Sequence, residues 1–123
     1  MQKYIDIVKK TPAEFTDYLL TTYYAEINID LSQEIGTPEL MAKVGSMICN
    51  CANKIISLSA LESTIEYVAR DVKRNATKPE YEDYIDKRKA LNSIKESLFL
   101  QSQTLSRVIT ANQEYLKELK MEG

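Results

Sequence analysis

The sequence of 123 residues contains no histidine. Without an imidazole, the chain cannot form a Ser-His or Cys-His nucleophilic centre, a Glu-x-x-His di-iron site or a histidine-containing zinc site. Glycine is nearly as scarce, with three residues at positions 36, 45 and 123, and no phosphate-binding pattern of the Gly-x-x-x-x-Gly-Lys or Gly-x-Gly-x-x-Gly type occurs. We therefore expect a protein that is not an enzyme and that binds neither a cofactor nor a metal ion.

Cysteines and long apolar runs are also rare. Cys49 and Cys51 stand two residues apart. On a helix their thiols point about 200° away from each other, so they can neither form a disulfide nor share a metal ion.

No run of about 18 apolar residues is available to span a bilayer, and Met1 to Lys10 has neither the apolar core nor the cleavage site of a signal peptide. We therefore expect a cytoplasmic protein that does not enter a membrane.

Charge of neither sign dominates the chain. Sixteen Lys and Arg residues stand against eighteen Asp and Glu residues, which gives a net charge of −2. This balance provides no molecule-wide field to attract nucleic acid or an anionic membrane, so any basic surface must be local. The length and the 44% apolar content suit a single helical domain over residues 1–123, with an N-terminal arm and helix over 1–36 and a helical hairpin over 37–123.

The strongest periodic signal lies between Met41 and Val72. Apolar residues recur there in steps of three and four, and one acid, Glu62, interrupts the row. Such a stripe, without proline and with a single glycine, predicts a long amphipathic helix whose seam packs against another helix. The preceding Gly36-Thr37-Pro38 supplies a left-handed stop and then a helix start. We therefore place this helix at about residues 38–74.

A second stripe with the same spacing predicts another long helix over about residues 79–120. The segment between the two helices, Asn75–Pro79, favours a turn, because asparagine tolerates a helix-ending conformation and the residue before proline avoids the α region. Two long seams joined by so short a loop predict a long antiparallel helical hairpin, which is an all-α fold.

The position of the turn sets the register of this hairpin. Facing residue numbers should sum to about 153, so Glu66 faces Lys87, and Glu62 lies within a turn of Arg88. We expect these charge pairs to fix the register more than they stabilise the fold. Asn112 falls at a seam position towards the open end, where it is a candidate contact for a third element.

A shorter N-terminal helix is predicted over about residues 12–26. Thr11-Pro12 and Glu14 suit a helix start with a capping box. We expect this helix to pack on the open end of the hairpin, with its apolar face against a stripe of small residues. The apolar face comprises Phe15, Leu19 and Tyr23, and the small stripe comprises Ala42, Gly45, Cys49 and Ala52. Residues 1–10 form a short helix or a docking arm, and residues 27–32 form an extended connector or one helical turn.

Several apolar side chains do not fit into a single two-helix seam. Leaving each of them in water forfeits about 1.5–3 kcal/mol, so self-association is the simplest way to cover them. The expected partner or self-association face comprises Leu58, Leu61, Val68, Phe99, Leu100 and Gln103. The neutral polar stretch Ser93–Gln113 beside it also suits a protein partner. We therefore predict a dimer or a higher oligomer.

Basic residues gather around the predicted turn, with tyrosines among them. The expected nucleic-acid contacts are Arg70, Lys73, Arg74, Lys78, Tyr81, Lys87, Arg88 and Lys89. Tyrosine rings could stack on bases while the cations contact phosphates. Five acids share the same stretch, however, so a solvated and ion-paired tip is the alternative interpretation.

The densest group of acids follows the turn and comprises Glu80, Glu82, Asp83 and Asp86. Carboxylates in such a group could hold a divalent cation. The simpler interpretation is that acids in the first two turns of a helix complement its dipole.

Three hypotheses for function follow from these patterns. The first is a self-associating helical adaptor or inhibitor that acts by protein contacts, in the manner of small viral or mobile-element accessory proteins, an analogy drawn from the helical build alone. The second is a nucleic-acid accessory protein, such as a recombination or replication helper, that binds through the basic hairpin tip. The third is a structural subunit of a larger assembly.

Overall fold

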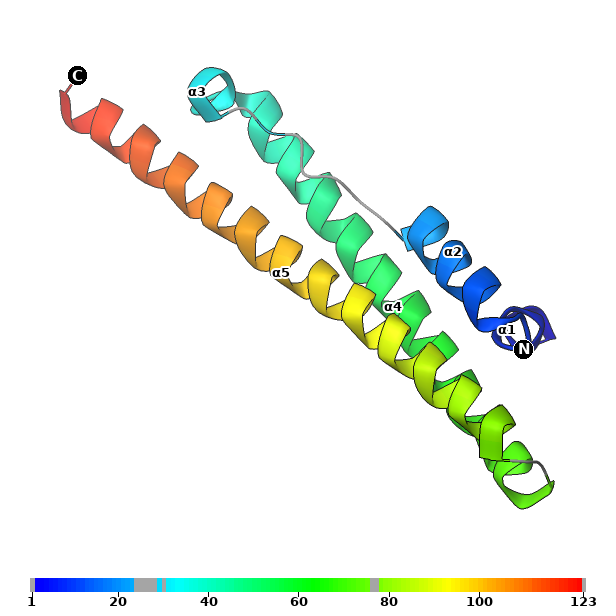
Figure 1. Cartoon of the computed structure of the whole chain (residues 1–123). Coiled ribbons are helices and arrows are strands. Elements are labelled where there is room, and N and C mark those ends of the chain that lie inside the picture. The colour runs from blue at the N-terminus through cyan, green and yellow to red at the C-terminus, as the bar shows by residue number, and fades with distance from the viewer. Residues whose placement is uncertain (1, 24–28, 30, 76–77, 123) are drawn as a thin grey trace.

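The computed structural model describes residues 2–23, 29, 31–75 and 78–122. Within these ranges the chain forms five helices: α1 (Gln2–Val8), α2 (Pro12–Tyr23), α3 (Leu31–Glu34), α4 (Pro38–Asn75) and α5 (Lys78–Glu122). Figure 1 shows α4 and α5 side by side and antiparallel over most of their length. The prediction of an all-α fold built on a long antiparallel hairpin, with a shorter N-terminal helix packed on it, is confirmed.

The two hairpin helices are unusually long. α4 has 38 residues and α5 has 45. At a rise of about 1.5 Å per residue they extend for about 57 and 68 Å. α5 therefore continues past the start of α4, and its last apolar side chains, Leu119 and Met121, are exposed there.

Helix starts occur at the predicted caps. The Thr37 hydroxyl oxygen accepts the backbone N–H of Leu40 at 3.3 Å, and Gly36 before it has φ of 83°. Thr11 accepts the backbone N–H of Glu14 at 3.3 Å and donates its hydroxyl to the Glu14 carboxylate at 3.0 Å. Each cap pairs a backbone donor that the first turn of a helix leaves without an intrahelical partner.

The seam between α4 and α5 is the core of the fold. Its buried apolar side chains include Val44, Cys51, Leu58 and Ile65 from α4, with Leu91, Leu98 and Leu105 from α5. The seam also contains Asn112, whose Oδ1 accepts the backbone N–H of Gly36 at 2.6 Å. Asn112 of α5 thus contacts the turn at Gly36, which precedes α4. This agrees with the prediction that Asn112 contacts a third element.

Of the two predicted charge contacts of the hairpin, the proximity of Glu62 to Arg88 is confirmed and the pairing of Glu66 with Lys87 is wrong by one residue. Glu66 contacts Arg88 at 3.3 Å rather than Lys87, and Glu62 contacts Lys95 at 3.3 Å and Arg88 at 4.0 Å. The reason is that Lys87 points into the core, whereas Arg88 and Lys95 lie at the edge of the seam.

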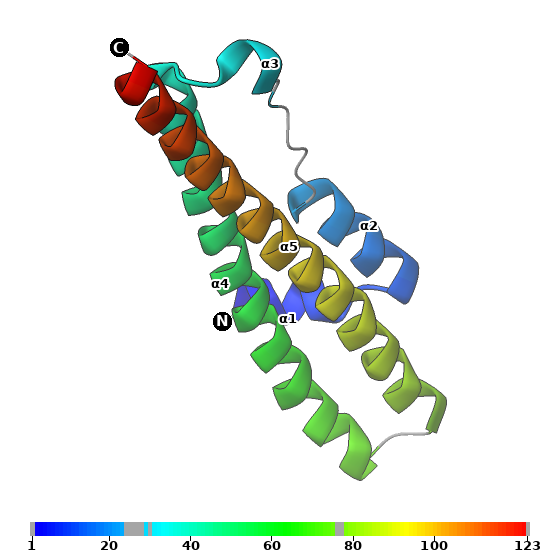
Figure 2. The same ribbon diagram turned by 90° about the vertical axis from the view of Figure 1, so that its left-hand side faces the viewer.

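The N-terminal helices lie on the tip-side half of the hairpin, and not on its open end as predicted. The Tyr23 and Ser57 hydroxyls are hydrogen-bonded at 2.6 Å near the middle of α4, and the Lys87 ammonium lies 6.0 Å from the Phe15 ring centroid. Figures 1 and 2 show α1 and α2 together beside this half, with α3 at the far end. We call residues 57–75 and 78–98 the tip half, and residues 38–56 and 99–122 the open half.

The stripe of small residues on α4 is therefore not covered by α2 as predicted. Ala42, Cys49 and Ala52 are exposed, and a Cβ atom built on Gly45 would meet no atom within 4 Å. Phe15 and Leu19 of α2, which were expected to cover this stripe, are buried in the hydrophobic core instead. The expectation that they fill the small stripe was wrong.

One stretch of α4, Pro38–Arg70, is long and apolar enough to cross a membrane. Polar residues such as Asn53 and Lys54 interrupt it, which is why the sequence shows no unbroken apolar run. The core helix of a soluble protein passes the same test of length and composition, so this is weak evidence for a membrane. In this fold α4 packs against α5.

Candidate functional site

The hairpin has one side that α1 and α2 do not cover. Ser93 and Ser97 line a hollow together with side chains of α2. Lys95, midway between them in sequence, lies about 200° around α5 from each. The side that carries the Lys95–Glu62 and Arg88–Glu66 pairs therefore faces away from α2. We call this side the uncovered face.

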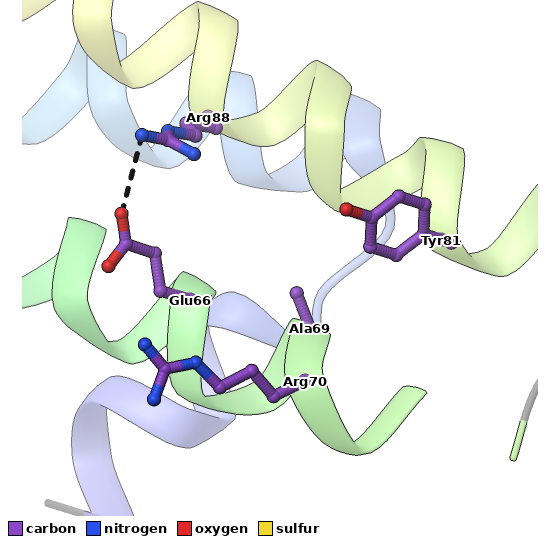
Figure 3. Close-up of a pocket in the computed structure, with 5 residues that line it drawn as sticks. All are labelled: Glu66, Ala69, Arg70, Tyr81 and Arg88. Atoms are coloured by element: carbon purple, nitrogen blue, oxygen red, sulfur yellow. Dashed lines mark ion pairs between the residues drawn. The ribbon is translucent and has the colours of Figure 1, made fainter. Parts of the chain in front are cut away.

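A hollow of about 310 Å³ lies between α4 and α5 in the tip half of this face. It is lined by Glu66, Ala69, Arg70, Tyr81 and Arg88. Figure 3 shows the two arginines approaching it from opposite helices, with the tyrosine hydroxyl directed into it. Two guanidinium groups and a phenol are donors that suit a phosphate, but the Glu66 carboxylate already accepts from Arg88.

The predicted tip contacts have different positions in the structure. Arg70, Lys89 and Arg88 are exposed, and Tyr81 is partly buried. The side chains of Lys73, Arg74 and Lys78 lie outside the part of the chain for which side chains are described. Three of the predicted residues, Arg70, Tyr81 and Arg88, are brought together in the hollow.

Lys87 was wrongly predicted as a nucleic-acid contact. Its side chain is only 4% exposed, and Nζ donates to the backbone carbonyl of Val8, the last residue of α1, at 2.7 Å. Nζ also lies 4.8 Å from the Tyr84 ring centroid. Burial lowers the pKa of this ammonium, while the Asp83 carboxylate acts in the opposite direction. The physical reason for the error is that a seam position of α5 points into the core, where no phosphate can reach.

The acids after the turn do not form a metal site in the described structure. Across residues 2–23, 29, 31–75 and 78–122, no three Cys, Asp or Glu side chains come close enough together to hold an ion. Glu80 stands in the first turn of α5, where a carboxylate complements the helix dipole.

Half of the predicted partner face is buried within the chain. Leu58, Leu61 and Val68 belong to the core cluster, together with Ile7 and Phe15 from the N-terminal helices. Their assignment to an exposed face was wrong, because α1 and α2 cover the tip half where these residues lie.

The other half of the predicted face is exposed. Phe99 is 50% exposed, Leu100 is 57% exposed, and Gln103 is exposed as well. Sequence reasoning missed Ile56, which is 67% exposed on α4. The signal was present, since Ile56 stands next to the seam residue Ile55 and so cannot share its direction.

The middle of the hairpin, where the two halves meet, carries few charges. Between Val44 and Leu61 only Lys54 is charged, and between Ser97 and Gln113 only Arg107 is charged. The tip half, by contrast, contains the ion pairs described above. The exposed surface over residues 44–61 and 97–113 is thus made mostly of small, neutral polar and apolar side chains. Cys49 is an exposed free thiol there, whereas the thiol of Cys51 is buried, which raises its pKa.

No protein-family model, no curated protein and no solved structure matches this chain.

Proposed function

We propose that this chain is a non-enzymatic helical adaptor or inhibitor that self-associates through the open half of its hairpin and acts by contacts with other proteins. The observation that carries the proposal is the amount of surface that the single chain leaves in water. Its accessible surface is 8334 Å². A compact monomer of 14.1 kDa exposes about 6,700 Å² by the usual size scaling. The excess is therefore about 1,600 Å² per chain.

The chemistry of this excess surface supports protein contacts. Several large apolar side chains are exposed: Ile56 and Leu100 by more than half, and Phe99 by half. They lie where charged residues are few, and depletion of charge is typical of the centre of a protein–protein interface. The neutral polar side chains between Ser93 and Gln113 can form hydrogen bonds with a protein partner without the cost of burying a charge.

Sedimentation velocity of the purified full chain at micromolar concentration tests the proposal. We expect a dimer or a higher oligomer whose population increases with protein concentration. A mass of one chain at every concentration reached would contradict self-association.

A second candidate function is binding of single-stranded nucleic acid by the tip hollow. The specific observation in its favour is that Arg70, Tyr81 and Arg88 line one cavity. The double variant Arg70→Glu, Arg88→Glu should then lose binding to a single-stranded oligonucleotide in a gel-shift assay. Arg107→Glu, an exposed site in the open half, is the matched control and should bind normally. Equal shifts by all three proteins would exclude the tip as the binding site.

A further inference from the structure

A polar hollow of about 320 Å³ lies where α1, α2 and α4 meet, and we call it the three-helix hollow. Ser57 of α4 lines it, and this residue lies about 180° around α4 from Glu66, which lines the tip hollow. The two hollows are therefore on opposite sides of α4. Small-molecule pockets in proteins have volumes of about 300–1,000 Å³, so the three-helix hollow can hold one small ligand.

Three tyrosines belong to the wall of this hollow, Tyr4 from α1 with Tyr18 and Tyr23 from α2. The Tyr18 and Tyr23 rings meet edge to face with their centroids 6.2 Å apart, and the Tyr23 and Ser57 hydroxyls are hydrogen-bonded at 2.6 Å. Tyr23 is buried, whereas Tyr4 and Tyr18 are partly exposed. Burial and the nearby phenols of Tyr18 and Tyr4 raise the pKa of Tyr23, so its hydroxyl is neutral at physiological pH. This wall offers aromatic surface to a planar ring and carries no negative charge.

Two ammonium groups stand at the same hollow, Lys3 from α1 and Lys54 from α4. None of the described residues that line it is Asp or Glu. Neither lysine forms an ion pair with a side chain that the structure describes. In the tip hollow, by contrast, Arg88 is already paired with Glu66 at 3.3 Å. The three-helix hollow therefore has positive charge available for an anion such as a phosphate.

Two side-chain amides complete the α4 wall. Asn50 and Asn53 line the hollow within one helical turn of Lys54, and neither amide has a hydrogen-bond partner among the described residues. Each offers two N–H donors and one carbonyl acceptor. An asparagine amide can pair with the edge of a base through one donor and one acceptor, as it does with adenine. The hollow thus brings together the groups that recognise a ring, a base edge and a phosphate.

We propose that the three-helix hollow binds a nucleotide, with the base against the tyrosines, its edge on Asn50 or Asn53, and its phosphate at Lys3 and Lys54. A free mononucleotide and one nucleotide of a single strand offer this same chemistry. The inference is independent of self-association, because it concerns a hollow within one chain.

Isothermal titration calorimetry of the full chain with AMP tests the proposal. Adenosine and inorganic phosphate are separate titrants, because each lacks one part of the recognised ligand. We expect AMP to bind, and each of the two fragments to bind at least about tenfold more weakly, since hydrogen bonds to a charged group are each worth about 1.5–3 kcal/mol.

Asn53→Asp tests the site with a side chain of the same size. It places a carboxylate where the phosphate and the base edge would lie, and we expect it to weaken AMP binding at least about tenfold. Asn92→Asp, at an exposed position of α5 that does not line the hollow, is the matched control and should bind AMP as the wild type does. Circular dichroism checks that both variants retain their helices.

The double variant Lys3→Gln, Lys54→Gln tests the phosphate contacts. We expect it to bind AMP at least about tenfold more weakly than the wild type, while its affinity for adenosine stays the same. The double variant Lys9→Gln, Lys10→Gln makes the same change in net charge at two exposed positions outside the hollow, and it should bind AMP normally.

The source of the nucleotide is tested by titrating a short oligodeoxyadenylate. Binding tighter than that of AMP and weakened by Asn53→Asp would support the inference with a strand as the ligand, and weaker binding than that of AMP would support it with a free nucleotide. No binding of AMP by the wild type at millimolar concentration, or equal binding by the wild type and Asn53→Asp, would overturn the inference. Inorganic phosphate that binds as tightly as AMP would overturn it as well, because the base would then contribute nothing.

Discussion

At the scale of single residues, Lys87 shows how a charge can be structural. It occupies a seam position of α5 and donates to the last carbonyl of α1, so it fixes α1 to the hairpin. The C-terminal carbonyls of a helix have no intrahelical donors and carry partial negative charge, which an ammonium satisfies. The buried cation is thus compensated by a direct hydrogen bond to a carbonyl and by the Tyr84 ring, with the nearby Asp83 carboxylate also favouring its charged form.

Replacing Lys87 should destabilise the fold. Hydrogen bonds to charged groups contribute about 1.5–3 kcal/mol, so we expect Lys87→Ala to lower the free energy of unfolding by about that amount. Urea denaturation followed by circular dichroism measures the change. Lys89→Ala, at an exposed position two residues away, is the control and should change stability by less than about 0.5 kcal/mol. Equal stability of the two variants would show that the Val8 contact contributes little.

Lys87 should also give the protein a specific pH dependence. Burial lowers its folded-state pKa below the ordinary 10.5, so between the two values the unfolded state binds more protons than the folded state. The contribution of Lys87 to stability therefore rises with pH across this window, and the cost of burying its charge is complete below it. Burial raises the pKa of Cys51, Tyr23 and Tyr84, which weakens the fold at alkaline pH.

The comparison with Lys87→Met isolates this contribution, because the other groups are present in both proteins. The stability of the wild type relative to the variant should increase from neutral pH towards pH 10.5. Urea denaturation at a series of pH values measures it. A constant difference would mean that the ammonium titrates alike in the folded and unfolded chains.

Two glycines should respond in opposite ways to the same substitution. At Gly36, φ is +83° and an added Cβ would lie 2.7 Å from Cε1 of Tyr115, so Gly36→Ala should cost at least about 1–2 kcal/mol. At Gly45, in the interior of α4 with open space beside it, alanine should stabilise the helix by about 0.5–1 kcal/mol. Thermal unfolding of both variants and the wild type at one protein concentration measures the two changes. A stability change of the same sign at both glycines would contradict the expectation.

At the scale of helices, the sequence predicts the long elements well and the position of the short ones poorly. α4 and α5 carry matching seams and their own caps, so periodicity and turn chemistry were sufficient to place them. The location of α2 depends on contacts between segments far apart in sequence, such as Tyr23 with Ser57 and Lys87 with Val8. No local pattern encodes such contacts. For the same reason, sequence patterns could not show that α1 and α2 cover Leu58 and Leu61, which we predicted to be exposed.

The docking of α2 depends chiefly on its buried apolar face. Phe15 is fully buried among residues of α1, α4 and α5. Phe15→Ala should therefore cost about 3–5 kcal/mol. Hydrogen exchange should show faster exchange of α2 amides, while the amides in the open half of α4 and α5 remain protected. Uniform loss of protection along both long helices would mean that the hairpin and α2 form one cooperative unit.

At the scale of the whole molecule, an elongated hairpin determines how surface is exposed. A compact domain of this length has a radius of gyration of about 14 Å. α5 alone extends for about 68 Å, so the isolated chain should have a radius of gyration near about 20 Å. Small-angle scattering of the wild type, extrapolated to low protein concentration, measures this value. A result close to that of a compact domain would show that the hairpin folds back on itself in solution.

The candidate sites were predicted only in part, because the turn is encoded locally whereas the direction and the covering of side chains depend on the whole fold. Sequence reasoning found Arg70, Tyr81 and Arg88 at the tip because the turn is encoded locally. It placed Lys87 among them because charge was considered without the direction of the side chain. The position of Ile56 beside Ile55 places it off the seam, but which side of the hairpin α1 and α2 cover follows only from the assembled fold.

The contacts along the hairpin also carry information about the order in which the chain closes. The Glu62–Lys95 pair joins residues 33 apart in sequence, Cys51–Gln101 joins residues 50 apart, and Gly36–Asn112 joins residues 76 apart. Loop-closure entropy rises with separation, so contacts near the turn form at the lowest entropic cost and each one shortens the effective loop for the next. The hairpin should zip from its turn towards its ends. The open half of the hairpin, through which we propose that the chain self-associates, would then be among the last parts to form, after the turn and its neighbouring contacts are in place.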